Sequence, residues 1–154
     1  MATPVYVVNA DRTVGGLVVG HATAAQAVAR FGPSARTPGG GGMVCHLSWR
    51  ALGVRMTFLD FAQHACTKGA LVGVTITSRA RWRTALGLRV GDTEARLRAL
   101  YPRAVWHREP PSGYWLVPRR SCEETAAAPY AGLLARVGGD RRVSTLVVTA
   151  GVCE

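Results

Sequence analysis

The pattern of apolar and polar positions occurs twice along this 154-residue chain. Residues 16–20 and 87–91 both read Gly-Leu-x-Val-Gly. A threonine follows each copy within three residues, Thr23 in the first and Thr93 in the second. Such a polar residue ahead of an apolar periodic run is typical of a helix N-terminus. We therefore predict two copies of one module, each opening on a turn and a short helix.

Each predicted helix has one apolar face. In the first copy the apolar positions recur at i, i+3, i+4 and i+7: Ala24, Ala27, Val28 and Phe31. Thr23 and Gln26 have the spacing of a capping box. In the second copy the buried face is predicted to hold Leu97, Leu100 and Tyr101. Gly32 and Pro102 end the two helices.

Strands are predicted where β-branched and aromatic residues gather between turn signals. They cover residues 4–8, 43–49, 54–59, 71–77, 104–107, 114–117, 133–137 and 143–149. Pro4 suggests an edge position for the first. Residues 50–53 form a hairpin turn with Gly53 at positive φ, and residues 34–42 read as a loop. The first module is then a helix followed by a three-stranded antiparallel meander.

The repeat has a nearly constant offset. Its matched positions are 70 to 72 residues apart: Gly16 with Gly87, Gly20 with Gly91, Phe31 with Tyr101, Leu71 with Val143, Val74 with Leu146, and Ile76 with Val148. A module of about 70 residues is marginal alone, so two stabilise each other by packing. We predict an α+β fold of two tandem helix-plus-antiparallel-sheet modules, residues 1–80 and 81–154. Together they form one continuous sheet with helices packed on one face and the other face open.

The composition suits a packed and basic protein. Hydrophobic residues make up 48% of the chain and charged residues 18%, which is enough apolar content for a core. The net charge is +10, from 19 basic and 9 acidic residues, and Lys68 is the only lysine. This charge favours anionic partners, although solvated surface charge is the simpler interpretation.

The chain has no candidate transmembrane segment, because no apolar run approaches about 18 residues. Residues 1–4 read as an initiator methionine placed before a mature N-terminus. We therefore expect an export signal to have been removed, and the protein to be secreted or periplasmic.

Four cysteines support an oxidising compartment. We predict disulfides between Cys45 and Cys66 and between Cys122 and Cys153. The first would close a loop of about 20 residues. A zinc site using Cys45, His46, His64 and Cys66 is the alternative. Cys45 and His46 are adjacent on a predicted strand, so their side chains point to opposite faces, which disfavours that alternative. Free or differently paired thiols are a third.

No catalytic signature stands out. The chain lacks a Gly-x-Ser-x-Gly elbow, a His-Glu-x-x-His motif and a dinucleotide fingerprint. Asp92 is better explained by the N-terminus of the second helix, where a carboxylate is favourable. His21 occupies the matching place in the first copy, and His46 and His107 are candidates to line a sheet face. We predict a protein that is not an enzyme, with no cofactor and no metal.

Aromatic and arginine residues are the candidate partner-binding set, since both are enriched at interface hot spots. The set comprises Trp49, Trp82, Trp106, Tyr114, Trp115, Arg79, Arg81 and Arg83. Trp82 is of special interest because charged residues flank it. The alternative is that these tryptophans fill the core.

The phrases Val19-Gly20-His21-Ala22-Thr23 and Val90-Gly91-Asp92-Thr93 resemble the turn-and-helix openings of the β-lactamase inhibitor protein-like (BLIP-like) tandem-repeat superfamily. Related single modules occur in small outer-membrane assembly lipoproteins. The resemblance covers most of residues 14–150. It implies two modules that form a concave, aromatic-lined sheet clamping a partner protein. The inhibitor carries an acidic residue in its first hairpin, whereas this chain has Arg50-Ala51-Leu52-Gly53 there.

These observations predict a secreted or periplasmic, non-enzymatic protein-binding module, inhibitor-like in design, that uses an open aromatic-lined sheet face. The partner is expected in the cell envelope or outside the cell. The alternative is a binder of an anionic cell-envelope polymer or another polyanion through the basic surface. The cysteines argue against a cytosolic nucleic-acid role.

Overall fold

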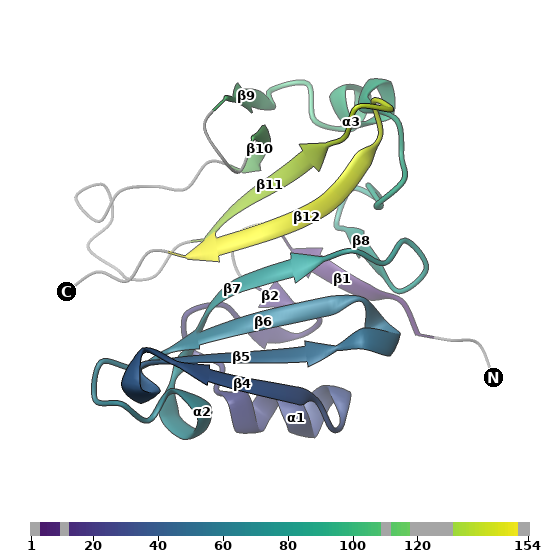
Figure 1. Cartoon of the computed structure of the whole chain (residues 1–154). Helices are drawn as coiled ribbons and strands as arrows, with labels where there is room; N and C mark the ends of the chain where they lie inside the picture. Colours follow the sequence, from purple (N-terminus) through teal and green to yellow (C-terminus); the bar gives the residue numbers. More distant parts are fainter. Residues whose placement is uncertain (1–3, 10–12, 109–111, 118–130, 151–154) are drawn as a thin grey trace.

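The computed structural model describes residues 4–9, 13–108, 112–117 and 131–150 (Figure 1). Its helices are α1 (Ala24–Phe31), α2 (Ala65–Lys68) and α3 (Glu94–Leu100), with 3₁₀ turns η1 (Gly40–Gly42) and η2 (Arg50–Leu52). The strands are β1 (Tyr6–Asn9), β2 (Thr13–Val14), β3 (Leu17–Val18), β4 (Ala35–Gly39), β5 (Val44–Trp49), β6 (Val54–Leu59), β7 (Ala70–Ile76), β8 (Trp82–Thr84), β9 (Val105–His107), β10 (Gly113–Val117), β11 (Ala131–Val137) and β12 (Val143–Ala150).

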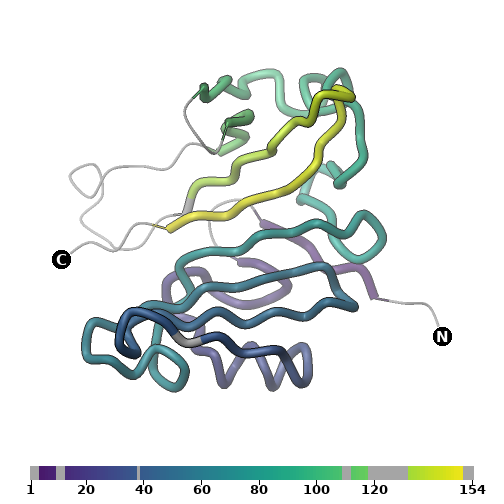
Figure 2. The backbone as a smooth tube through the Cα atoms, viewed as in Figure 1, coloured from purple at the N-terminus to yellow at the C-terminus, as the bar shows by residue number. Residues whose placement is uncertain are grey.

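One eight-stranded antiparallel sheet runs through the molecule in the order β4-β5-β6-β7-β12-β11-β10-β9. The two halves of the chain meet at β7 and β12, where Leu146 pairs with Ile76 and Val148 with Val74. Figure 2 shows these strands side by side although they are distant in the sequence. The predicted α+β fold with a continuous sheet is therefore confirmed.

The two opening turns are held in the same way. The Gly20 amide donates to the Leu71 carbonyl at 2.6 Å, and the Gly91 amide donates to the Val143 carbonyl at 2.7 Å. Both glycines have positive φ, 87° and 89°. The Thr23 hydroxyl accepts from the Gln26 amide in a full capping box, and the Thr93 hydroxyl accepts from the Arg96 amide. These matching contacts agree with the predicted duplication.

A second, four-stranded sheet of order β3-β2-β1-β8 lies on the helix side of the large sheet (Figure 1). The predicted edge position of the first strand is wrong, because β1 lies between antiparallel β2 and parallel β8. Pro4 precedes the strand, so its missing N–H removes no ladder bond. Residues 82–84, for which no strand was predicted, thus form β8.

The first meander has four strands rather than three. Residues 35–39, expected in a loop, form β4, which pairs with β5 from Ala35–Ser48 to Gly39–Val44. Pro38 is tolerated because β4 is an edge strand and one side of it needs no ladder bonds. The predicted hairpin turn is confirmed, with Gly53 in the left-handed region at φ 58°.

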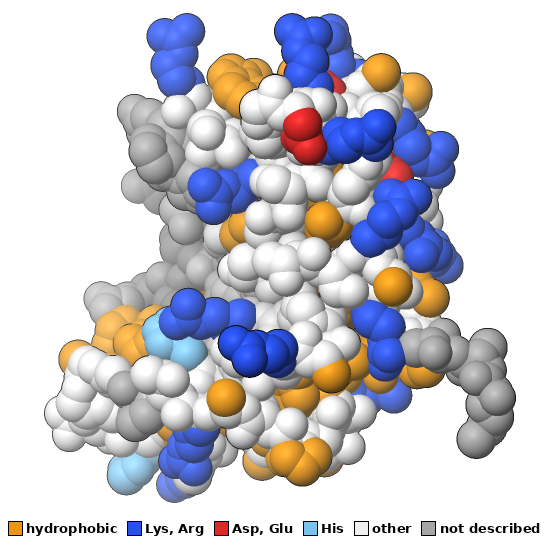
Figure 3. Space-filling model, turned by 45° about the vertical axis from the view of Figure 1, so that its right-hand side comes forward, with side chains coloured by type: hydrophobic (Ala, Val, Ile, Leu, Met, Phe, Trp, Pro, Cys, Tyr) orange, Lys and Arg blue, Asp and Glu red, His pale blue; other side chains and the backbone are white. Residues whose placement is uncertain are grey.

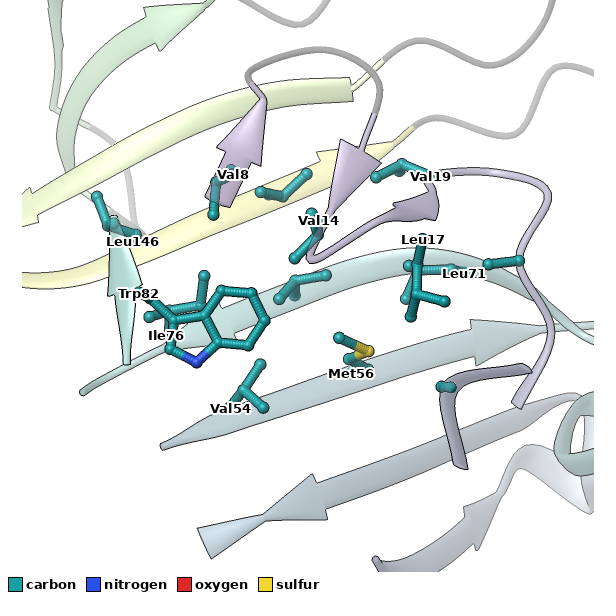
Figure 4. Close-up of a cluster of buried hydrophobic side chains, with 14 of the residues drawn as sticks. Val8, Val14, Leu17, Val19, Val54, Met56, Leu71, Ile76, Trp82 and Leu146 are labelled. Carbon is teal, nitrogen blue, oxygen red and sulfur yellow. The ribbon is translucent and has the colours of Figure 1, made fainter. Parts of the chain in front are cut away.

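The core is one apolar cluster that draws on both halves of the chain (Figure 4). Trp82 is fully buried in it, and its indole Nε1 donates to the Leu52 carbonyl at 2.9 Å. The Trp82 ring centroid lies 5.0 Å from that of Tyr6 and 5.8 Å from that of Phe31. The proposed boundary between residues 80 and 81 stays a prediction. Trp82, which follows this boundary in the chain, packs with residues of the first module.

The predicted Cys45–Cys66 disulfide is confirmed and joins β5 to α2, with a Cα–Cα distance of 5.1 Å. Both sulfurs are used in this bond, so neither is available as a zinc-ligating thiolate. Cys122 and Cys153 lie outside the described residues. Among the helices of the described ranges, none has the length and hydropathy needed to cross a bilayer.

Candidate binding surface

Two of the predicted partner-binding residues belong to the core. Trp49 is 4% exposed and Trp82 is fully buried. Trp49 donates from Nε1 to the Gly32 carbonyl at 2.8 Å. The interpretation of Trp82 as a surface residue is wrong, because strand alternation turns it inward between half-buried Arg81 and Arg83.

The other predicted aromatic residues gather at the β9–β10 end of the large sheet. Trp106 pairs with Tyr114, their rings 5.0 Å apart on the helix side. Trp115 pairs with Val105 and lies 5.8 Å from the His107 ring, on the opposite face. These five residues (Val105, Trp106, His107, Tyr114 and Trp115) are called the aromatic edge below. Sequence reasoning missed Val105 and gave His107 no binding role.

The aromatic edge combines exposed apolar surface with a fixed support. Val105 is 60% exposed and Trp106 50% exposed. Behind Trp106, the Tyr114 hydroxyl donates to the Glu94 carboxylate of α3. This hydrogen bond, followed by burial, raises the pKa of Tyr114, so the contact holds across the neutral range. Trp106 is therefore presented to solvent on a rigid aromatic support.

Along its row of paired residues, the open face of the large sheet changes from polar on β5, β6 and β7 to apolar on β12, β11 and β10, where Leu134 is fully buried. The residues paired in register across it are Ser48, Arg55, Thr75, Val147, Leu134 and Trp115. His46 lies on the same face, where its Nδ1 is 2.9 Å from the Thr57 hydroxyl. The expectation of an aromatic-lined open face is therefore corrected, since Trp115 and His107 line only the β9–β10 end.

A second feature is a group of arginines around one buried carboxylate. Arg79 Nη1 lies 2.5 Å from Asp92 Oδ1, and Arg96 Nε lies 3.3 Å from Asp92 Oδ2. The Arg89 amide donates to the same carboxylate at 2.8 Å, and Arg142 Nη1 donates to the Gly91 carbonyl at 2.9 Å. We call Arg79, Arg89, Arg96 and Arg142 the arginine cluster.

The arginine cluster carries excess positive charge. Asp92 is 7% exposed, whereas Arg79 and Arg96 are 59% and 54% exposed. Figure 3 shows basic side chains crowded along one side of the molecule with few acidic ones among them. Sequence reasoning saw Asp92 only as a helix-terminal residue, although the i,i+4 spacing to Arg96 was a usable signal.

Replacing Asp92 by asparagine should lower the free energy of unfolding by about 1–3 kcal/mol at pH 7, because hydrogen bonds to a charged group are lost. Burial alone would raise the pKa of Asp92, but the Arg79 and Arg89 hydrogen bonds and the nearby guanidiniums lower it overall. Because the pKa of Asp92 is lower in the folded than in the unfolded chain, its ionised carboxylate stabilises the folded state at pH values above the unfolded pKa of about 3.9. This stabilisation is lost as the pH falls below that pKa. Urea unfolding of both proteins from pH 7 to pH 2.5 measures this. A difference that stays constant over that range would contradict it.

The three predicted arginines do not act together. Arg79 belongs to the arginine cluster, whereas Arg83 Nη1 donates to the Thr84 carbonyl at 3.3 Å. The Nε of Arg81 is buried and has no hydrogen-bond partner within the described ranges. Only Arg79 of the three is thus placed in an organised, exposed charge cluster.

Within residues 4–9, 13–108, 112–117 and 131–150, no three His, Cys, Asp or Glu side chains gather in an arrangement that could hold a metal ion. Comparison with protein-family models, with curated proteins and with solved structures finds no match to this chain.

Proposed function

We propose that this chain is a non-enzymatic protein-binding module of the secreted or periplasmic space, and that it holds its partner at the aromatic edge. The observation that carries this is the exposure of Trp106 on a terminal strand, with Tyr114 anchored behind it and Val105 exposed on the opposite face of the same strand. Tryptophan and tyrosine are the residues most enriched at interface hot spots.

Two further features support the proposal. The Cys45–Cys66 disulfide suits an oxidising compartment. The tandem modules on one continuous sheet also agree with the architecture that the BLIP-like resemblance implies. The proposal includes that this chain is a member of that superfamily and that it has an inhibitor-like role. The binding surface is moved from the open face to the aromatic edge, because exposed Trp106 lies there beside other aromatic side chains.

Trp106→Ala should weaken partner binding by about 2 kcal/mol, or about thirtyfold, as expected for a hot-spot residue. The partner is first captured from an envelope or culture-supernatant fraction and identified, and its affinity is then measured with the purified proteins. Phe61→Ala is the matched control, because Phe61 is 60% exposed and lies in the β6–α2 connection. Equal affinities for the wild type and Trp106→Ala would exclude the aromatic edge as the binding surface.

The arginine cluster favours a second candidate function, the binding of an anionic polymer. Affinity for long-chain polyphosphate should then fall steeply with salt, because each neutralised charge releases counterions. Arg79→Gln should reduce the slope of log K against log salt by about one. Arg36→Gln, an exposed arginine on β4, is the control. If Arg79→Gln and Arg36→Gln change this slope equally, the arginine cluster is excluded as the polymer-binding site.

A further inference from the structure

Strand β9 ends the eight-stranded sheet, and only one of its two sides is paired. Its three residues pair with β10, and no strand in the described part of the chain pairs with its outer side. An unpaired strand edge presents N–H and C=O groups that a further strand can satisfy. The opposite edge of the sheet, β4, contains Pro38, a residue typical of protected edges, whereas β9 contains no proline.

We infer that the outer edge of β9 binds an extended, acidic segment of a partner protein as an added ninth strand. This inference rests on the proposed function and specifies its binding mode and the chemistry of the partner. In strand addition the main-chain hydrogen bonds supply affinity, and pockets for alternate side chains supply specificity. At β9 the unpaired outer side can supply the main-chain hydrogen bonds, and a hollow next to Trp106 can supply a side-chain pocket.

The charged residues beside β9 indicate which kind of segment can pair with its outer edge. Exposed Arg103 and Arg108 flank the strand on either side. Antiparallel pairing of two β9 strands about Trp106 would set Arg108 of one chain opposite Ala104 of the other, next to Arg103, so like charges would lie close together. A partner segment with a carboxylate at each end would instead place negative charges next to the guanidiniums of Arg103 and Arg108. The flanking arginines thus disfavour self-association and favour an acidic partner.

A hollow of about 650 Å³ lies next to Trp106 on the helix side of β9. Arg98, Tyr101, Pro102, Trp106 and Tyr114 contribute to its walls, and Arg98 is the charged residue among the described ones that line it. Directly paired residues of neighbouring strands point to the same face. The partner residue opposite Trp106 would therefore point toward this hollow. Trp106 and Tyr114 form an aromatic wall against which a partner side chain can pack, while most of the exposed lining of the hollow is polar.

The test uses four blocked nonapeptides titrated into the full chain, with the backbone amides of residues 105–107 followed by NMR. The first has glutamates at both ends and a Val-Phe-Val centre, and the second has lysines in place of the glutamates. The third and fourth are the glutamate peptide N-methylated on its odd-numbered or its even-numbered central amides. Edge pairing uses alternate amides, so one methylated peptide should lose binding and the other should keep it.

We expect the lysine peptide to bind at least about tenfold more weakly than the glutamate peptide. Trp106→Ala should weaken the glutamate peptide by a similar factor, and Phe61→Ala should leave it unchanged. Equal binding of the two methylated peptides, or of the two charge types, would overturn strand addition even if Trp106→Ala still weakens the identified partner. An affinity for that partner unaffected by Trp106→Ala would instead overturn the proposed function.

Discussion

Trp82→Ala should lower the free energy of unfolding by about 3–5 kcal/mol, the range for removing a large buried aromatic side chain. Trp82 is fully buried, contacts Tyr6 and Phe31, and donates a hydrogen bond to the Leu52 carbonyl. Its removal leaves both a cavity and an unpaired buried carbonyl. Chemical denaturation at pH 7 measures the loss, and it should appear as a lower midpoint with an unchanged slope.

Two variants make this result specific. Trp106→Ala removes the same atoms from a half-exposed site and should cost about 1 kcal/mol, chiefly the aromatic pair with Tyr114. Trp82→Phe keeps one aromatic ring but loses the indole donor and part of the buried volume, so its cost should lie between those of Trp106→Ala and Trp82→Ala. A Trp82→Ala variant as stable as Trp106→Ala would show that residue 82 is not in the core. It would also restore Trp82 as a candidate surface residue.

Removing the Cys45–Cys66 disulfide should lower the free energy of unfolding by about 3 kcal/mol, because the unfolded chain regains the freedom of a closed loop. The two cysteines are 21 residues apart, and the bond ties α2 to the buried side of β5. The double variant Cys45→Ala and Cys66→Ala tests this by denaturation. It leaves Cys122 and Cys153 in place, so the effect belongs to this one bond.

A thiol count provides the control. Cys66→Ser should show one more titratable thiol than the wild type under denaturing, non-reducing conditions, since Cys45 is then released. One fewer thiol would mean that the wild-type pair is not formed, and the argument for an oxidising compartment would lose its support. Equal stability of the double variant and the wild type would contradict the chain-entropy argument.

Local patterns predicted most of the elements correctly. The N-cap threonines and apolar periodicity located α1 and α3, and alternation located most of the strands to within a residue or two. The strands β2, β3, β4 and β8 and the helix α2 were not predicted, and two of these strands share a cause. β4 and β8 are paired to other strands by backbone hydrogen bonds, while Pro38 and the arginines of 79–83 carry the composition of loops. Pairing partners supply stability that composition does not record.

The binding surface was harder to predict than the elements. Trp82 and Trp106 both sit in short strands next to arginines, and nothing local distinguishes them. Trp82 is buried because β8 pairs with β1, about 75 residues earlier in the chain, and lies beneath the large sheet. Trp106 is exposed because β9 is the last strand of that sheet. Position in the sheet, and not residue type, decides which aromatic residue is available.

The sequence by itself predicted the repeat, the helix caps and the α+β class, because each depends on residues close in the chain or on a regular period. It favoured the Cys45–Cys66 pairing over a zinc site, and the structure decided between them. The tertiary structure alone decided which of the repeated features face water. It turned Trp49 and Trp82 into core residues, gathered Arg79, Arg89, Arg96 and Arg142 near Asp92, and left the outer side of β9 without a partner strand among the described residues. These outcomes depend on which distant strands pair, and local hydrophobic patterns carry little information about that choice.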